Sequence, residues 1–121
     1  MLLALILVFE SCSVNPFSGK KTIALIPNSS ILPLSTQEYD KFLSENKVVS
    51  GTLDSERIVR VGVKLTEAAE LWLNANQYND YLKDYNWEYK LVENDLVNAW
   101  CMPGGKIVFF TGILPITQNE T

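Results

Sequence analysis

The sequence predicts an α+β domain, in which two helices pack on a small, mostly antiparallel sheet that finishes with a C-terminal hairpin. Two segments with apolar residues at three- and four-residue spacing precede three short segments typical of strands. The chain has 121 residues, 47% of them apolar, which is enough for one core. We expect residues 1–12 to be a signal-like segment, 13–34 an extended tether and 35–121 the folded part.

An uninterrupted apolar run opens the chain. Residues 1–9 are all apolar, and Glu10, Ser11 and Cys12 follow before the composition turns polar. Nine residues are too few to span a bilayer, which takes about 20. The pattern resembles the end of a bacterial lipoprotein signal peptide, so it predicts Cys12 as the lipid attachment site. A buried first strand is the alternative, because no Lys or Arg precedes the run and Glu10 stands where a small neutral residue is usual.

The next segment predicts no long helix. Pro16, Pro27 and Pro33 interrupt residues 13–34, and a proline inside a helix removes a hydrogen bond and clashes with the preceding turn. Acylation of Cys12 would leave Cys101 without a cysteine partner, so we expect no disulfide. A Cys12–Cys101 bridge in an exported, non-lipidated form is the alternative. We expect Cys101 to act as a small apolar side chain on a half-buried strand.

Two helices follow in the prediction. Ser35 and Glu38 have capping-box spacing, which places the first helix over residues 35–46. Asp54 is the expected cap of a helix over residues 54–73. Gly62 costs about 1 kcal/mol relative to Ala inside that helix, so we expect another backbone to pack closely there. An apolar stripe on the second helix should face the core: Ile58, Val61, Leu65, Ala68 and Trp72.

Three strands complete the predicted sheet, over residues 87–92, 96–102 and 106–111. Pro103 and Gly104 suit a type II turn between the last two. Residues 107–110 are apolar on both faces, which is typical of a central strand covered on both sides. One cover should be the long helix, and the other is something that this chain need not supply.

Charge and composition exclude several functions. A net charge of −4 with scattered basic residues argues against a nucleic-acid partner, which requires clustered Lys and Arg. The chain has no histidine, whereas a zinc hydrolase of the His-Glu-x-x-His type needs two imidazoles on one helix face. The chain alone therefore supplies no zinc ligand set, and whether it belongs to an enzyme stays open on composition.

Residues 98–114 carry a more specific pattern. Asn98-Ala99 leads to a Pro-Gly-Gly turn and a Thr-Gly-Ile-Leu strand end, and Thr117 and Glu120 have capping-box spacing for a further helix. This pattern resembles the zinc metallopeptidases of the HtpX and CAAX-prenyl-protease type, peptidase family M forty-eight, most closely their bacterial envelope lipoprotein branch. In that family the strand end leads into the helix that carries His-Glu-x-x-His.

The resemblance implies the N-terminal part of a zincin-like metallopeptidase. It implies a zinc cofactor, a polypeptide substrate and a C-terminal catalytic half that this sequence lacks, so the chain as given is not expected to be active. The segment Asn98, Ala99 and Trp100 resembles the family's substrate edge strand. A lipid-anchored membrane protein of the bacterial envelope, facing the periplasm and serving protein quality control, is the implied setting.

Two other function classes remain open. A short, non-catalytic lipoprotein could use the helix-and-sheet layer to bind an extended peptide or a partner protein. An unrelated inhibitor-like or sugar-binding α+β module is the third class, because aromatic residues lie close together at Tyr78, Tyr81, Tyr85 and Trp87. The coding sequence after codon 121 separates the first class from the second.

Overall fold

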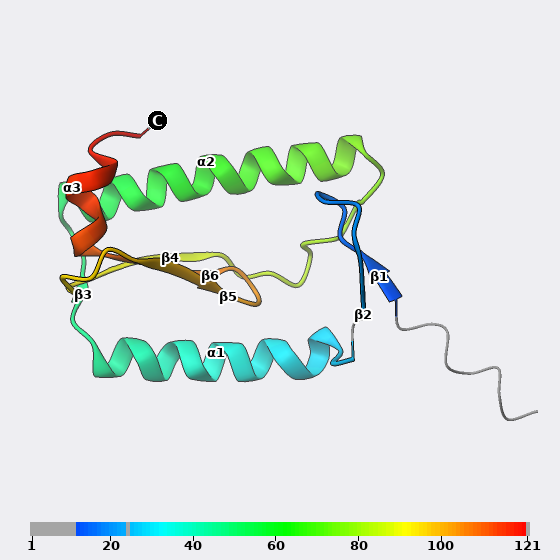
Figure 1. The fold of residues 1–121 in the computed structure, drawn as a ribbon, viewed down its shortest axis with the longest axis horizontal. Coiled ribbons are helices and arrows are strands. Elements are labelled where there is room, and N and C mark those ends of the chain that lie inside the picture. The colour runs from blue at the N-terminus through cyan, green and yellow to red at the C-terminus, as the bar shows by residue number, and fades with distance from the viewer. Residues whose placement is uncertain (1–11, 24, 121) are drawn as a thin grey trace, which may run out of the picture.

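Two long helices lie on opposite faces of a four-stranded sheet in the computed structural model, which describes residues 12–23 and 25–120 (Figure 1). The predicted α+β class is confirmed. The helices are α1 (Asn28–Glu45) and α2 (Leu53–Ala75). The sheet contains β3 (Val48–Val49), β4 (Glu88–Val92), β5 (Ala99–Met102) and β6 (Lys106–Phe110).

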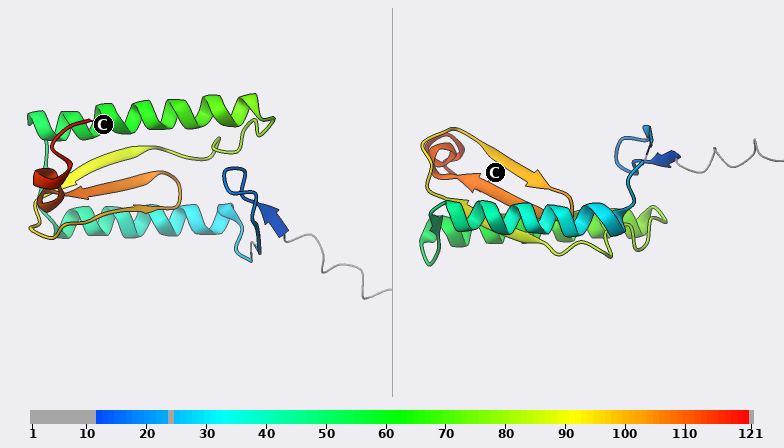
Figure 2. Two further views of the ribbon diagram at one scale, coloured as in Figure 1. Left: turned by 45° about the horizontal axis from the view of Figure 1, so that its top comes forward. Right: turned by 90° about the horizontal axis from the view of Figure 1, so that it is seen from below.

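A hairpin and two short helical turns complete the described part of the chain. Strands β1 (Cys12–Val14) and β2 (Lys21–Ile23) form a separate antiparallel hairpin. It lies beside the start of α1 and the end of α2, at the opposite end of the molecule from α3 (Figure 2). A 3-10 turn, η1 (Thr111–Ile113), and α3 (Leu114–Thr117) follow β6.

The sheet has the strand order β3-β4-β6-β5. β3 pairs antiparallel with β4, and β5 pairs antiparallel with β6, whereas β4 and β6 are parallel. The mostly antiparallel sheet and its C-terminal hairpin are therefore confirmed. β6 lies between β4 and β5, as its two apolar faces predicted.

The core lies between α1 and one face of this sheet. Tyr39 on α1 and Val92, Val108 and Phe110 on the sheet are buried together. Strand side chains alternate between faces, so these alternate positions of β6 point towards α1. The cover that the sequence analysis left unassigned for the second face of β6 is thus the first helix.

The first helix begins earlier than predicted. α1 starts at Asn28, and Pro33 lies inside it, so residues 13–34 are not an extended tether throughout. Ser35 is not the cap, because its hydroxyl donates to the Pro103 carbonyl at 2.7 Å, inside the fold. The added turns bring Leu32 against Gly104 in the β5–β6 turn. Tertiary packing of this kind outweighs the hydrogen bond that Pro33 removes.

The second helix has a different cap and a shifted inner face. Thr52, not Asp54, caps α2, because its hydroxyl accepts from the Ser55 amide and the Ser55 hydroxyl accepts from the Thr52 amide. Gly62 does lie at a close approach, but the neighbour is the Tyr89 ring rather than a backbone. The predicted stripe is only partly buried, since Leu65 is 66% exposed, whereas Gly62 and Leu73 are buried.

The predicted capping box at Thr117 and Glu120 does not form. Thr117 is the last residue of α3, and its hydroxyl donates back to the carbonyls of Ile113 and Leu114. The Glu120 carboxylate instead lies 2.7 Å from Arg60 and 3.6 Å from Lys64 on α2. Among the described residues, no helix is both long and apolar enough to cross a membrane.

Candidate functional site

Among the residues that the structure describes, strand β5 lies at the edge of the sheet and pairs only with β6. The Phe110 amide donates to the Asn98 carbonyl at 3.0 Å, which marks this pair as a hydrogen-bonded one. Hydrogen-bonded and non-bonded pairs alternate along an antiparallel ladder. The backbone N–H and C=O of Trp100, which is paired with Val108, therefore point towards β6. The backbone N–H and C=O groups of Ala99 and Cys101 point towards the free edge of the sheet.

The side chains of this strand divide between the two faces. Trp100 points towards α1, where its ring meets Phe42 edge-on at 4.9 Å between centroids. The side chains of Ala99 and Cys101 lie on the other face of the sheet, next to their partners Phe109 and Ile107 on β6. Of the three predicted substrate-edge residues, Trp100 is thus held by packing, Ala99 presents its backbone at the edge, and Asn98 is exposed just before the strand.

A hydrogen-bonded junction fixes the start of β5. The Thr111 hydroxyl donates to the Asn94 carbonyl and accepts from the Asn94 amide, both at 3.1 Å. The Gly112 amide donates to the same carbonyl at 2.9 Å. A Cβ at Gly112 would come within 2.5 Å of the Asp95 and Leu96 carbonyl oxygens. Thr111 and Gly112 therefore set where the chain turns into the edge strand, a role that their motif alone did not reveal.

The turn at the other end of β5 is also tightly held. Gly104 and Gly105 have φ of +88° and +84°, a region that favours glycine. A Cβ at Gly105 would lie 2.7 Å from the Trp87 ring, so any side chain at that position would clash with the ring. Together with the bond from Ser35 to Pro103, these contacts keep the β5–β6 hairpin against α1. The predicted Pro-Gly turn is confirmed.

An ion pair between a buried lysine and a partly exposed glutamate lies beneath this hairpin, on the face towards α1. The Lys106 ammonium is 3% exposed and donates to the Glu88 carboxylate at 2.7 Å and to the Asn86 carbonyl at 2.8 Å. The hydrogen bond from Lys106 lowers the pKa of Glu88. Burial, reinforced by the Glu88 charge, raises the pKa of Tyr39. Lys106 is therefore held as a charged partner that links β4 to β6, and sequence reasoning missed it because the pair spans 18 positions.

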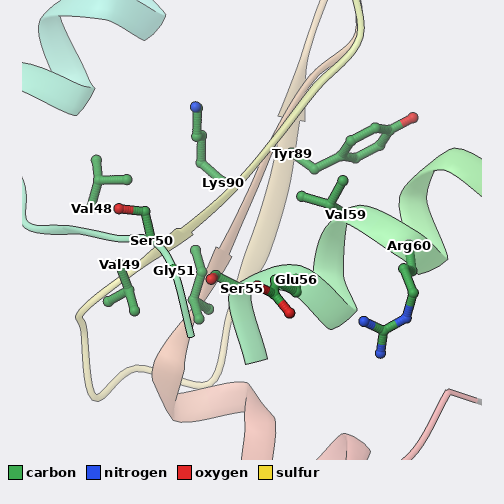
Figure 3. A pocket seen from close by; sticks show the side chains of 11 residues that line it. Val48, Val49, Ser50, Gly51, Ser55, Glu56, Val59, Arg60, Tyr89 and Lys90 are labelled. Atoms are coloured by element: carbon green, nitrogen blue, oxygen red, sulfur yellow. The ribbon is translucent and has the colours of Figure 1, made fainter. Parts of the chain in front are cut away.

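The opposite face of the sheet is incompletely covered. α2 lies over β4, and an apolar cavity of 160 Å³ lies between it and β6. Val61 and Leu65 of the predicted stripe line this cavity, with Ile107 and Phe109 of the central strand. A second, larger cavity of 490 Å³ opens between the start of α2 and β3–β4 (Figure 3). Its lining includes Val48, Val49, Val59, Arg60, Tyr89 and Lys90.

The residues present do not fit a zinc centre. The chain has no histidine, and within residues 12–23 and 25–120 no three Cys, Asp or Glu side chains gather where they could hold a metal ion. Cys101 is exposed and lies on β5, and Glu120 is taken by Arg60 and Lys64. Cys12, the predicted lipid attachment site, is the first residue of β1, opposite Ile23. Lipidation there stays a prediction.

The chain is similar to mitochondrial metalloendopeptidases. It is 26% identical to metalloendopeptidase OMA1, mitochondrial, of Homo sapiens over 113 residues, which is 93% of this chain and 21% of that protein, and the Bos taurus protein matches equally. The Saccharomyces cerevisiae mitochondrial metalloendopeptidase OMA1 is 34% identical over 68 residues, 54% of this chain and 19% of that protein. The chain thus spans about a fifth of these relatives' length. No family model and no solved structure matches.

These relatives support the metallopeptidase interpretation and correct its setting. Similarity over nearly the whole chain supports a metallopeptidase likeness, although not the bacterial lipoprotein branch. The predicted location in a bacterial envelope, facing the periplasm, is wrong, because the relatives are eukaryotic proteins named as mitochondrial. An apolar run of nine residues before a Cys is a weak signal, and Glu10 already departed from the lipoprotein pattern.

Proposed function

We propose that this chain forms the substrate-binding layer of a zinc metalloendopeptidase, with β5 as the strand along which an extended polypeptide lies. The observation that carries the proposal is the register of β5, which directs the backbone groups of Ala99 and Cys101 to the free edge of the sheet. An extended peptide would add as a further strand and pair with these groups. Similarity to metalloendopeptidases supports a polypeptide as the substrate.

The shape of the edge suits this role. Ala99 is small, so a peptide backbone can approach it, and Trp100 is held on the other face by Phe42. The Thr111–Gly112 junction and the Gly104–Gly105 turn fix both ends of the strand. A rigid edge loses little conformational entropy when it binds, which favours capture of a flexible chain.

Catalysis would come from residues beyond those in this sequence. Within residues 12–23 and 25–120 no group of Cys, Asp and Glu side chains could hold a metal ion, so the zinc ligands of such an enzyme would have to lie outside this part of the chain. The incompletely covered face of β6, at Ile107 and Phe109, favours a further layer of the protein there. Reading the coding DNA after codon 121 tests this directly. A frame that encodes Gly-His-Glu-x-x-His supports the proposal, and an immediate stop codon contradicts it.

A non-catalytic peptide-binding module is the second candidate, because the free edge of β5 could pair with a peptide without any further layer of protein. Both candidates use the same edge of β5. They differ in whether peptide bound at that edge is cleaved once the full coding sequence is expressed with zinc. A peptide that binds at the edge of β5 but is not cleaved would support the non-catalytic binding module.

Replacement of Ala99 by proline tests the edge in either case. Proline removes the outward N–H without removing a bond to β6, so the fold should persist while peptide affinity falls about tenfold, the value of one backbone hydrogen bond. Ala99→Ser is the matched control, because it keeps the N–H and a side chain of nearly the same size at this position. Fluorescence anisotropy of a labelled extended peptide measures the affinity. Equal binding by the two variants would rule out pairing at Ala99.

A further inference from the structure

The β1–β2 hairpin and the link to α1 expose an unusual number of apolar side chains. Five of them lie within 13 residues: Val14 at 42% exposed, Phe17 at 53%, Ile23 at 69%, Leu25 at 82% and Ile26 at 59%. A two-stranded hairpin has no second layer of its own with which to cover such residues. We call Val14, Phe17, Lys20, Lys21, Ile23, Leu25 and Ile26 the hairpin patch.

The pairing of the hairpin gives it two different faces. Val14 lies opposite Lys21, so these two side chains share a face, and Ile23 on the same strand lies on that face too. The other face carries Ser13 and Thr22, whose hydroxyls are hydrogen-bonded at 3.1 Å. The hairpin therefore presents Val14, Lys21 and Ile23 together on one face and a hydrogen-bonded polar pair on the other.

The loop of the hairpin is fixed to the body of the protein. The Phe17 ring stacks on Trp72 of α2, with centroids 5.1 Å apart and an interplanar angle of 24°. Trp72 itself is 42% exposed. The hairpin patch is thus held in a defined orientation at the end of the molecule opposite α3 (Figures 1 and 2).

Charge distinguishes this end from the rest of the chain. Residues 11–37 contain Lys20 and Lys21 and no acidic residue, whereas residues 38–121 contain 8 basic and 13 acidic residues. Both lysines are exposed. The strand that leads into the hairpin also follows closely on the nine apolar residues that open the sequence. Apolar side chains with adjacent lysines are the combination that binds an anionic bilayer surface.

We infer that the hairpin patch docks this protein on the surface of an anionic lipid bilayer. The apolar side chains enter the interfacial region, and Lys20 and Lys21 meet the lipid phosphates. The largely acidic body is repelled by the same surface, so contact is limited to the hairpin end. This contact leaves the free edge of β5, in another part of the molecule, open to a peptide.

Co-sedimentation of the full chain with lipid vesicles tests the inference. Binding should be much stronger to phosphatidylcholine vesicles that contain about a fifth phosphatidylglycerol than to phosphatidylcholine alone. Lys20→Gln with Lys21→Gln should weaken binding about tenfold or more, because each surface lysine contributes separately. Lys41→Gln with Lys47→Gln changes the total charge equally and should leave binding within about twofold. Residues 1–9 remain in every variant, so differences between variants report on the hairpin.

Quenching by brominated lipid provides a second readout that does not depend on changing the hairpin. Trp72 stacks on Phe17, so its emission should be quenched on binding, and Trp72→Phe should remove most of that quenching. Equal binding to neutral and anionic vesicles, equal losses in the two lysine pairs, or unchanged quenching in Trp72→Phe would each overturn the inference. A protein that does not bind vesicles and dimerises through the hairpin would also overturn the inference. The hairpin patch would then be the contact with a second copy of the chain.

Discussion

Replacement of Gly62 by alanine should destabilise the protein, although alanine is the better helix former. Gly62 lies inside α2, where alanine is favoured by about 1 kcal/mol. A Cβ at this position would stand 2.3 to 2.7 Å from three atoms of the Tyr89 ring. That ring lies on β4 and its hydroxyl is hydrogen-bonded to Thr66 on α2, so it cannot move away freely.

The magnitude follows from the balance of these two effects. Overpacking a core contact costs about 1 to 3 kcal/mol, and a rigid ring held between helix and sheet belongs at the upper end. We therefore expect Gly62→Ala to lower the free energy of unfolding by about 2 kcal/mol. In a Tyr89→Ala background the contact is absent, so the same substitution should raise it by about 1 kcal/mol.

Urea denaturation followed by far-UV circular dichroism measures both steps of this double-mutant cycle. The predicted coupling between the two positions is about 3 kcal/mol. A Gly62→Ala chain that is more stable than the parent, with Tyr89 in place, would refute the close approach of β4 to α2. It would also remove the reason for the shifted inner face of that helix.

Two further predictions concern the contacts around α1. The hydrogen bond from Lys106 lowers the pKa of Glu88 from its usual 4.5. The ionised carboxylate therefore stabilises the folded state above about pH 4.5. This stabilisation is lost as the pH falls through the lower pKa of the folded state. Glu88→Gln should therefore flatten the acid side of the stability curve. An unchanged dependence of stability on pH, measured by urea titrations across the acid range, would contradict this. Ser35→Ala should cost about 1 kcal/mol and speed amide exchange at Gly104 and Gly105, because it removes the bond to Pro103; an unchanged exchange rate would argue against that link.

The sequence predicts the helices by periodicity, but their ends depend on distant partners. The second helix is recognisable because its apolar spacing extends from Ile58 to Trp72, about four turns, and that signal is local. The start of α1 was misplaced because Ser35 and Glu38 match a capping box, while the Ser35 hydroxyl in fact reaches a turn 68 positions away. A cap predicted from spacing alone cannot take such a contact into account.

The inner face of α2 shows a similar limit. The apolar residues Val61 and Leu65 predict an inner face that is shifted by about one residue from the observed one. The residues of α2 that are buried in the fold are Gly62 and Leu73. The offset exists because Tyr89 occupies the groove above the glycine. The apolar residues of a helix can therefore remain partly exposed to solvent within the folded chain.

The candidate site was located by motif, yet its geometry came from topology. The resemblance alone marks Asn98, Ala99 and Trp100 as an edge strand, because nothing in their composition separates an edge strand from a central one. β6 pairs with both β4 and β5, so it lies between them and leaves β5 at the edge. Which backbone groups point outward then follows from one hydrogen bond, between Phe110 and Asn98.

Amide hydrogen exchange along β5 tests the proposed peptide edge most directly. In the free chain, Trp100 should be protected by its pairing with β6, whereas Ala99 and Cys101 should exchange quickly. Addition of an extended peptide should slow exchange at Ala99 and Cys101 and leave Trp100 unchanged. Protection that does not alternate in the free chain, or that appears elsewhere on the molecule when peptide is added, would contradict the assignment of β5 as the substrate strand.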